Sequence, residues 1–154
     1  MFLNLEYRIV NTKLNSFKYI CNMINVWVNG CFDVLHKGHL ELLEFAAKQG
    51  DTLTIGIDCD YRVTDKKGKG RPYNDHYFRK KILESLTYVN KVIIFETDHQ
   101  LEQYIIQQQP VVMVLGEEHR GKKIIGESSC LEVIFFSTVQ GYSGTEIIKK
   151  IKKK

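Results

Sequence analysis

The sequence predicts an α/β domain with a five-stranded parallel sheet and helices on both faces. Short apolar runs that suit strands alternate with longer amphipathic stretches that suit helices along the 154 residues. The run Val-Ile-Ile-Phe at 92–95 is apolar at every position, as a strand covered on both faces requires. The stretch 38–49 places its apolar residues on one side and is followed by Gly50, which is typical of a helix end.

The expected elements follow one another in a regular order. The strands are expected at 26–28, 52–58, 92–95, 111–115 and 131–136. The helices are expected at 38–49, about 75–87, about 98–108 and 143–153. The longer loops are 60–74, which is rich in glycine and charge, and 116–129. Parallel strands of this kind bind ligands at their carboxyl ends, and the first strand is expected at the point where the strand order reverses.

The chain divides into an N-terminal extension, 1–25, and one domain, 26–154. Residues 1–25 show no strong hydrophobic period and mix polar with aromatic residues. A second methionine, Met23, stands just before the first expected strand, so Met23 is a candidate start of the working chain. The domain is long enough to bury a core of its own.

Composition and charge exclude several classes of protein. The hydrophobic and charged fractions, 44% and 26%, are those of a globular protein. Five lysines at 149–154 account for the net charge of +4, and without them 17 basic residues stand against 18 acidic ones. The body therefore offers no basic face for nucleic acid, and no apolar run is long enough for a membrane span. Four scattered cysteines predict a reducing, cytoplasmic setting.

The stretch 26–39 is the clearest candidate for a functional site. A strand ending at Gly30 runs through a short loop into a helix whose first turn holds His36, Gly38 and His39. A helix N-terminus has unpaired N–H groups and partial positive charge, so it favours bound anions. Two imidazoles three residues apart add N–H donors, and Gly38 lets a large anion approach the backbone. These features predict a phosphate site. Two exposed histidines at a polar helix start, or a metal-binding pair, are the alternatives.

The motif His36-Lys37-Gly38-His39, six residues after Gly30, resembles the HxGH signature of the cytidylyltransferase-like nucleotidyltransferases. The resemblance implies a Rossmann-like fold and transfer of a nucleotidyl group from a nucleoside triphosphate to a phosphorylated acceptor, with release of pyrophosphate. It also implies catalytic contacts from His36 and His39 to the triphosphate. The neighbouring residues that it places against the nucleotide are Gly30, Cys31, Phe32, Lys37 and Gly38.

A basic, glycine-rich segment contains Lys66, Lys67, Lys69 and Gly70-Arg71-Pro72. Glycines between cations suit a loop that folds over a polyphosphate, and a solvated surface loop is the alternative. With Arg79 on the next helix, the segment resembles the heptose-phosphate adenylyltransferase form of the family. The resemblance implies contacts from Lys69 and Arg79 to the β- and γ-phosphates and from Lys66 to the acceptor phosphate, although the register among the three lysines stays open.

The loop 116–122 resembles a glycine-acid-acid-aromatic loop of glycerol-3-phosphate cytidylyltransferases, with His119 in the aromatic place. Because it follows a strand's carboxyl end, Gly116 is expected beside the nucleotide. The residues that the resemblance places on the acceptor side of the site are Asp33, Lys66, Arg71, His119 and Lys122. The alternatives for Asp33 are that it orders the loop or contacts a metal ion. The alternative for the segment 116–122 is a plain surface loop.

The segment that opens the last helix, Gly141-Tyr142-Ser143-Gly144-Thr145, is similar to the family's Gly-x-Ser-Thr-Thr motif. Hydroxyls and amides at a helix start suit phosphate oxygens, so Gly141, Tyr142, Ser143 and Thr145 are expected at the nucleotide. Gly144 replaces a threonine of the motif. The cytidylyltransferase form also has an arginine where this chain has Ser137-Thr138, which counts against glycerol phosphate as the acceptor.

These resemblances favour a sugar 1-phosphate such as heptose phosphate as the acceptor, with ATP as the donor and a place in nucleotide-sugar biosynthesis. Glycerol 3-phosphate with CTP is the alternative within the family. A non-catalytic nucleotide-binding module is the rival from another class. Mg²⁺ is expected on the polyphosphate, with no certain protein ligand. Because family members often dimerise, a homodimer is an expected assembly.

Overall fold

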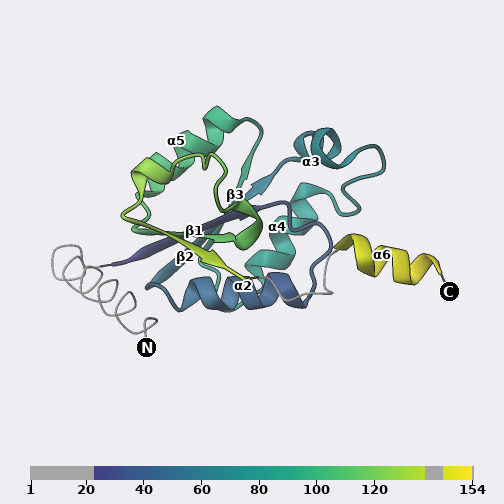
Figure 1. The fold of residues 1–154 in the computed structure, drawn as a ribbon, viewed down its shortest axis with the longest axis horizontal. Coiled ribbons are helices and arrows are strands. Elements are labelled where there is room, and N and C mark those ends of the chain that lie inside the picture. The colour runs from purple at the N-terminus through teal and green to yellow at the C-terminus, as the bar shows by residue number, and fades with distance from the viewer. Residues whose placement is uncertain (1–22, 138–143, 154) are drawn as a thin grey trace.

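The computed structural model describes residues 23–137 and 144–153 (Figure 1). Five parallel strands form one sheet in the order β3-β2-β1-β4-β5. The strands are β1 (Asn25–Gly30), β2 (Thr52–Asp58), β3 (Lys91–Phe95), β4 (Val112–Gly116) and β5 (Glu132–Phe136). The five-stranded parallel sheet predicted from the sequence is confirmed, and β1 stands where the strand order reverses. This position is the ligand crevice of open α/β sheets.

Helices cover both faces of the sheet (Figure 1). The α-helices are α2 (Lys37–Ala47), α3 (Asp60–Lys67), α4 (His76–Glu84), α5 (Asp98–Gln108) and α6 (Gly144–Lys152), and two 3₁₀ turns are η1 (Glu117–His119) and η2 (Glu127–Ser129). On one face, α2 and α4 bury Leu43 and Leu83 against β1, β2 and β4. On the other face, Leu101 and Ile105 of α5 pack around Trp27. Apolar side chains on both sides of β1 explain why it is buried throughout its centre.

The core begins slightly before the predicted domain boundary at 26. Ile24 is 5% exposed, and its N–H donates to Asp51 Oδ2 at 2.9 Å. A Cβ added at Gly50 would lie 2.6 Å from the Ile24 carbonyl oxygen, so the end of α2 approaches the start of β1 closely. Most of the predicted extension, 1–22, lies outside the described residues.

The prediction of a loop over the whole of 60–74 is wrong, because its first half is the helix α3. Asp60 lies in the first turn and Lys66 and Lys67 in the last, where their charges complement the helix dipole. Only Val63 of this helix is buried, so α3 has no apolar stripe that periodicity could reveal. Gly68 ends it with a φ of +91°, a conformation that glycine adopts freely.

Two other helix ends have clear causes. Asp75 caps α4 by accepting a hydrogen bond from the Phe78 N–H at 2.8 Å. Gln109, in the left-handed region at φ +46°, ends α5 directly before Pro110.

Within the described ranges, no helix is both long and apolar enough to cross a bilayer.

Candidate active site

The HxGH segment lies where β1 ends and α2 begins. His36 is the N-cap residue of α2 in an extended conformation, and no side chain caps the helix. The backbone N–H groups of His39 and Leu40 bond to the His36 carbonyl at 2.9 and 3.2 Å. Gly38 is buried in the first turn. The predicted arrangement of a strand, a loop and an uncapped helix N-terminus is therefore present, and it suits an anion.

His36 and His39 lie together. Their rings stack with centroids 3.8 Å apart and planes 21° from parallel. Phe32 packs against His39 from another side, with ring centroids 5.1 Å apart. The backbone of Phe32 has a φ of +47°, which marks a sharp turn in the loop. Nδ1 of His36 is buried and has no hydrogen-bond partner within the described part of the chain, so the pair offers ring nitrogens to a ligand.

Both imidazoles are held in the neutral form. Burial, together with the neighbouring charges of His36 and Lys67, lowers the pKa of His39 to about 4, and a hydrogen bond to the Val34 backbone acts in the opposite direction. Burial also lowers the pKa of His36, again with a contribution from Lys67. A neutral imidazole carries one N–H donor, and a nearby anion raises its pKa. The pair can therefore donate hydrogen bonds to a phosphate from its neutral rings.

Lys67 is the cation of α3 that acts on this pair. Its charge also lowers the pKa of the Cys31 thiol, although burial dominates there and the net pKa of Cys31 is raised. Lys66 instead bonds to Asp58 Oδ1 at 2.9 Å. Lys69 is exposed between Gly68 and Gly70. The sequence left the register among the lysines open, and Lys67 is the lysine whose charge lowers the pKa of both histidines.

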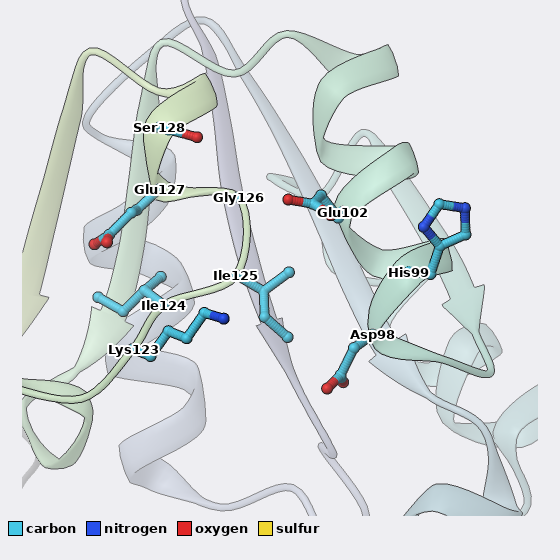
Figure 2. A pocket seen from close by; sticks show the side chains of 9 residues that line it. All are labelled: Asp98, His99, Glu102, Lys123, Ile124, Ile125, Gly126, Glu127 and Ser128. Atoms are coloured by element: carbon cyan, nitrogen blue, oxygen red, sulfur yellow. The ribbon is translucent and has the colours of Figure 1, made fainter.

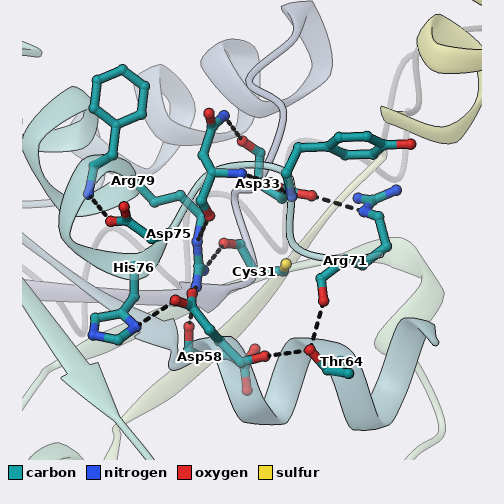
Figure 3. Close-up of polar contacts among 12 residues, drawn as sticks. Cys31, Asp33, Asp58, Thr64, Arg71, Asp75, His76 and Arg79 are labelled. Atoms are coloured by element: carbon teal, nitrogen blue, oxygen red, sulfur yellow. Dashed lines mark hydrogen bonds and ion pairs between the residues drawn. The ribbon is translucent and has the colours of Figure 1, made fainter. Parts of the chain in front are cut away.

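Asp33 joins the HxGH loop to the 68–75 segment (Figure 3). Its carboxylate accepts from Arg71 Nε at 2.8 Å, from the Tyr73 N–H at 2.8 Å and from the Asn74 N–H at 2.9 Å, and its side chain is 1% exposed. The Asn74 side chain donates to the Asp33 carbonyl at 2.8 Å. With its carboxylate occupied by three donors, Asp33 orders the loops. The prediction that Asp33 contacts the acceptor is therefore corrected: Asp33 holds Arg71, Tyr73 and Asn74 in place.

Arg79 is buried, and its guanidinium bonds to backbone carbonyls and to one carboxylate (Figure 3). Nε donates to the Asn74 carbonyl at 3.0 Å, and Nη1 donates to the Cys31 carbonyl at 2.6 Å. Nη2 donates to the Asp58 carbonyl and to Asp60 Oδ1, both at 2.8 Å. The side chain is 0% exposed. The expectation that Arg79 holds the β- and γ-phosphates is therefore corrected: Arg79 is a positioning residue that ties together the ends of β1 and β2, α3 and the segment before α4.

The Arg71 side chain is 14% exposed and is held by Asp33 and Tyr73. Its guanidinium stacks on the Tyr73 ring, with Cζ 4.9 Å from the centroid. Nη1 and Nη2 make no hydrogen bond to any residue that the structure describes. Since Asp33 accepts from Nε, the guanidinium group is held in one orientation.

The loop after β4 begins at buried Gly116 and forms η1. Arg120 pairs with Glu117 and lies 4.5 Å over the Phe135 ring. The side chain of His119 is 47% exposed, and Lys122 is also exposed. No contact within the described ranges joins His119 or Lys122 to the histidine pair, so their acceptor roles remain predictions.

The fourth predicted motif falls mostly outside the described residues, since Gly141, Tyr142 and Ser143 belong to 138–143. Thr145 lies in the first turn of α6. A Cβ added at Gly144 would lie 3.7 Å from the Val34 Cβ, so α6 starts beside the HxGH loop. This proximity agrees with a place for the motif at the nucleotide.

The residues present test the expected Mg²⁺. Among the described residues, no group of three or more His, Cys, Asp or Glu side chains could hold a metal ion. The nearby carboxylates of Asp33, Asp58 and Asp60 accept bonds from Arg or Lys. Mg²⁺ is commonly bound through substrate phosphates with few protein ligands. The residues present fit Mg²⁺ bound in this way, and they do not fit Mg²⁺ held by protein side chains alone.

The parallel sheet and its helices define a Rossmann-like domain, with the candidate phosphate site at the N-terminus of α2. A family model described as cytidylyltransferase-like matches residues 27–150, and the chain belongs to this family of nucleotidyltransferases.

Similar proteins agree with this assignment. The bifunctional protein HldE of Campylobacter fetus subsp. fetus (strain 82-40) is 41% identical over 127 residues, which are 82% of this chain and 28% of that protein. The protein of the same name from Campylobacter concisus (strain 13826) is 40% identical over 127 residues, or 82% of this chain and 27% of its own. This chain thus spans little more than a quarter of either relative's length.

A solved structure confirms the predicted fold class. The lipopolysaccharide core biosynthesis protein from Thermoplasma volcanium GSS1 superposes with a TM-score of 0.65 at 23% sequence identity. The match covers 77% of this chain and 99% of that chain.

Proposed function

We propose that this chain transfers a nucleotidyl group from a nucleoside triphosphate to a sugar 1-phosphate and releases pyrophosphate. The observation that carries the proposal is the stacked, neutral pair of His36 and His39 at the uncapped start of α2. Such a pair, with Lys67 beside it, can neutralise charge on a transferring phosphoryl group. The acceptor phosphate is itself the nucleophile and is largely dianionic at pH 7, so the reaction needs no strong general base.

Each residue near the pair has a separate part in the proposal. His36 and His39 donate to the α-phosphate region, where negative charge develops, and Lys67 with Lys69 holds the β- and γ-phosphates. Arg71, oriented by Asp33, meets the acceptor phosphate. Mg²⁺ bound to the triphosphate would reduce its charge. Catalysis is then mainly positioning and electrostatic stabilisation.

The acceptor we propose is a heptose 1-phosphate, with ATP as the donor. Gly70-Arg71-Pro72 followed by Arg79 supports it, because these residues resemble the heptose-phosphate adenylyltransferases. Glycerol 3-phosphate with CTP is the second candidate, which the 116–122 loop favours. Cys31, Cys59 and Cys130 are free thiols, which supports a cytoplasmic location. A homodimer remains an expectation from the family.

The test is pyrophosphate release from ATP or CTP, each with a panel of heptose 1-phosphate, mannose 1-phosphate, glycerol 3-phosphate and phosphoethanolamine. Release with ATP and heptose 1-phosphate supports the proposal. Release only with CTP and glycerol 3-phosphate replaces it with the second candidate. Nucleotide binding without release from any pair identifies a non-catalytic nucleotide-binding module.

A further inference from the structure

The side chain of Phe32 is buried beside the histidine pair. It is 4% exposed and belongs to the core cluster on the α2 face of the sheet, so any contact with the nucleotide must come from its backbone. Its ring meets the imidazole of His39 at an angle of 59°, with the centroids 5.1 Å apart. His36 stacks on the same imidazole at 3.8 Å. The imidazole of His39 is therefore in contact with two other rings.

Packing is the main restraint on the direction of this imidazole. Nδ1 of His39 is buried, and its contact with the Val34 backbone does not have the geometry of a normal hydrogen bond. No side chain among the described residues hydrogen-bonds to this ring either. Nε2 is then the nitrogen that can meet a phosphate. Because the Cβ–Cγ torsion of a histidine has a broad preference of its own, the rings around His39 decide where Nε2 points.

Gly30 leaves room for the Phe32 ring at the end of β1. A Cβ added at Gly30 would lie 3.1 Å from Cε2 and 3.4 Å from Cζ of Phe32. The shorter distance is tighter than an ordinary contact, so a side chain at this position would push the ring away. The end of β1 and the imidazole of His39 are therefore linked through one ring.

The backbone of Phe32 is strained. Its φ of +47° lies in the left-handed region, which costs free energy for a bulky residue and little for glycine. The residues on both sides hold it there: the Cys31 carbonyl accepts from Arg79 Nη1 at 2.6 Å, and the Asp33 carboxylate accepts three hydrogen bonds. Strained backbone persists where its surroundings fix it, and such places are often functional. A phenylalanine that is kept in this conformation indicates a role for its side chain.

We propose that Phe32 is a positioning residue whose ring, lying against Gly30, fixes the imidazole of His39 so that Nε2 faces the transferring phosphoryl group. This inference rests on the proposed function of the histidine pair. Because the ring of Phe32 is buried, it acts only through His39. Arg79 and Asp33 contribute indirectly, since they hold the backbone on either side of Phe32.

The test is a double-mutant cycle between Phe32→Leu and His39→Ala, measured as steady-state pyrophosphate release. Phe32→Leu is expected to lower kcat about tenfold, with KM for ATP changed less than about threefold, because a displaced imidazole stabilises the transition state less. In the His39→Ala background, the same substitution should change kcat less than about twofold, since no imidazole is left to position. An equal loss of kcat in both backgrounds overturns the proposal.

Two controls separate positioning from a general loss of packing. Phe45→Leu removes a ring near the other end of α2, where the ring contact with Phe136 is also tilted and also has centroids 5.1 Å apart. Ile125→Ala removes apolar atoms on the opposite face of the sheet, at a cavity of about 580 Å³ between α5 and 123–128 (Figure 2). Both controls should lower Tm and keep the wild-type kcat. A loss of kcat in them as large as that in Phe32→Leu overturns the proposal.

Gly30→Ala tests the same contact without removing the ring. It keeps Phe32 and adds one methyl group, which must shift the ring by a few tenths of an ångström. kcat should fall in the wild-type background and stay unchanged in the His39→Ala background. This variant also tests the proposal if Phe32→Leu does not fold. A wild-type kcat in Gly30→Ala overturns the proposal.

A measurement without turnover separates failure of this inference from failure of the proposed function. Burial is the main cause that lowers the pKa of His39 to about 4, and the Phe32 ring is part of that burial. In a proton NMR titration of the free protein, the His39 signal is identified by its absence in His39→Gln. Its pKa should rise toward the ordinary value in Phe32→Leu and stay unchanged in Phe45→Leu. This result supports the restraint of His39 by Phe32 even if no pyrophosphate is released, and equal pKa values in the two variants overturn it.

Discussion

The imidazole rings of His36 and His39 stack with their centroids 3.8 Å apart. Two imidazolium rings at this distance would repel each other, so the stack is compatible with neutral rings in the free protein. A bound polyphosphate acts in the opposite direction, because a nearby negative charge raises the pKa of an imidazole. Binding and charging of the pair are therefore linked, and the link has consequences that can be measured.

The stability of the free protein should fall as the pH falls from about 6.5 to 4. The pKa of His39 is lowered to about 4 in the folded state against 6.5 for the ordinary group, so the unfolded chain binds more protons in this window. The loss is at most about 3 kcal/mol from this residue. Urea unfolding of wild type and His39→Gln should show the difference, with a shallower pH dependence in the variant. Equal slopes would contradict the assigned pKa.

Replacing His39 by alanine should reduce turnover about 10²-fold or more, because one donor to the transferring phosphoryl group is lost. The fold should survive, since a desolvated imidazole is removed from a partly exposed site. The measurement is steady-state pyrophosphate release, with thermal unfolding as the control for folding. A turnover rate equal to that of the wild type would refute the role of His39.

Lys67 and Lys66 are adjacent and serve as controls for each other. Lys67→Ala should raise KM for the triphosphate about tenfold or more, because its charge lies near the histidine pair. Lys66→Ala removes an ion pair with Asp58 whose lysine side chain is 52% exposed, so the KM for the triphosphate should change little. Kinetics with ATP as the varied substrate distinguish the two. A larger effect from Lys66 would reverse the assignment.

Arg79→Lys should lower the free energy of unfolding by about 3 kcal/mol, since a buried guanidinium with four partners is replaced by a group that cannot reach them all. Arg120→Lys is the control, because Arg120 is an exposed arginine paired with Glu117, and its effect on the free energy of unfolding should be much smaller. A phosphate ligand would behave differently: Arg79→Lys would keep both the charge and the stability. Urea unfolding decides between the two roles.

The sheet could be predicted because each strand is a short apolar run, and such a run can be recognised from the local sequence alone. The helix α3 could not, since only Val63 of its eight residues is buried and its remaining surface is polar. Its capping charges, Asp60 at the start and Lys66 and Lys67 at the end, were the available signal.

The site was predictable in part for a related reason. The pairing of His36 and His39 at the start of α2 depends on neighbouring residues, so the sequence was enough to predict it. The role of Arg79 depends on carbonyls of Asn74, Cys31 and Asp58, which come from three different segments. Motif resemblance therefore marked Arg79 as important but assigned it the wrong partner.

The most direct test is phosphorus NMR of the wild-type protein with ATP, Mg²⁺ and heptose 1-phosphate. We expect the ATP signals to be replaced by those of a sugar-linked diphosphate and free pyrophosphate in equal amounts, and we expect His39→Ala to slow this conversion about 10²-fold. Bound ATP that stays intact with every acceptor of the panel would contradict nucleotidyl transfer at the histidine pair.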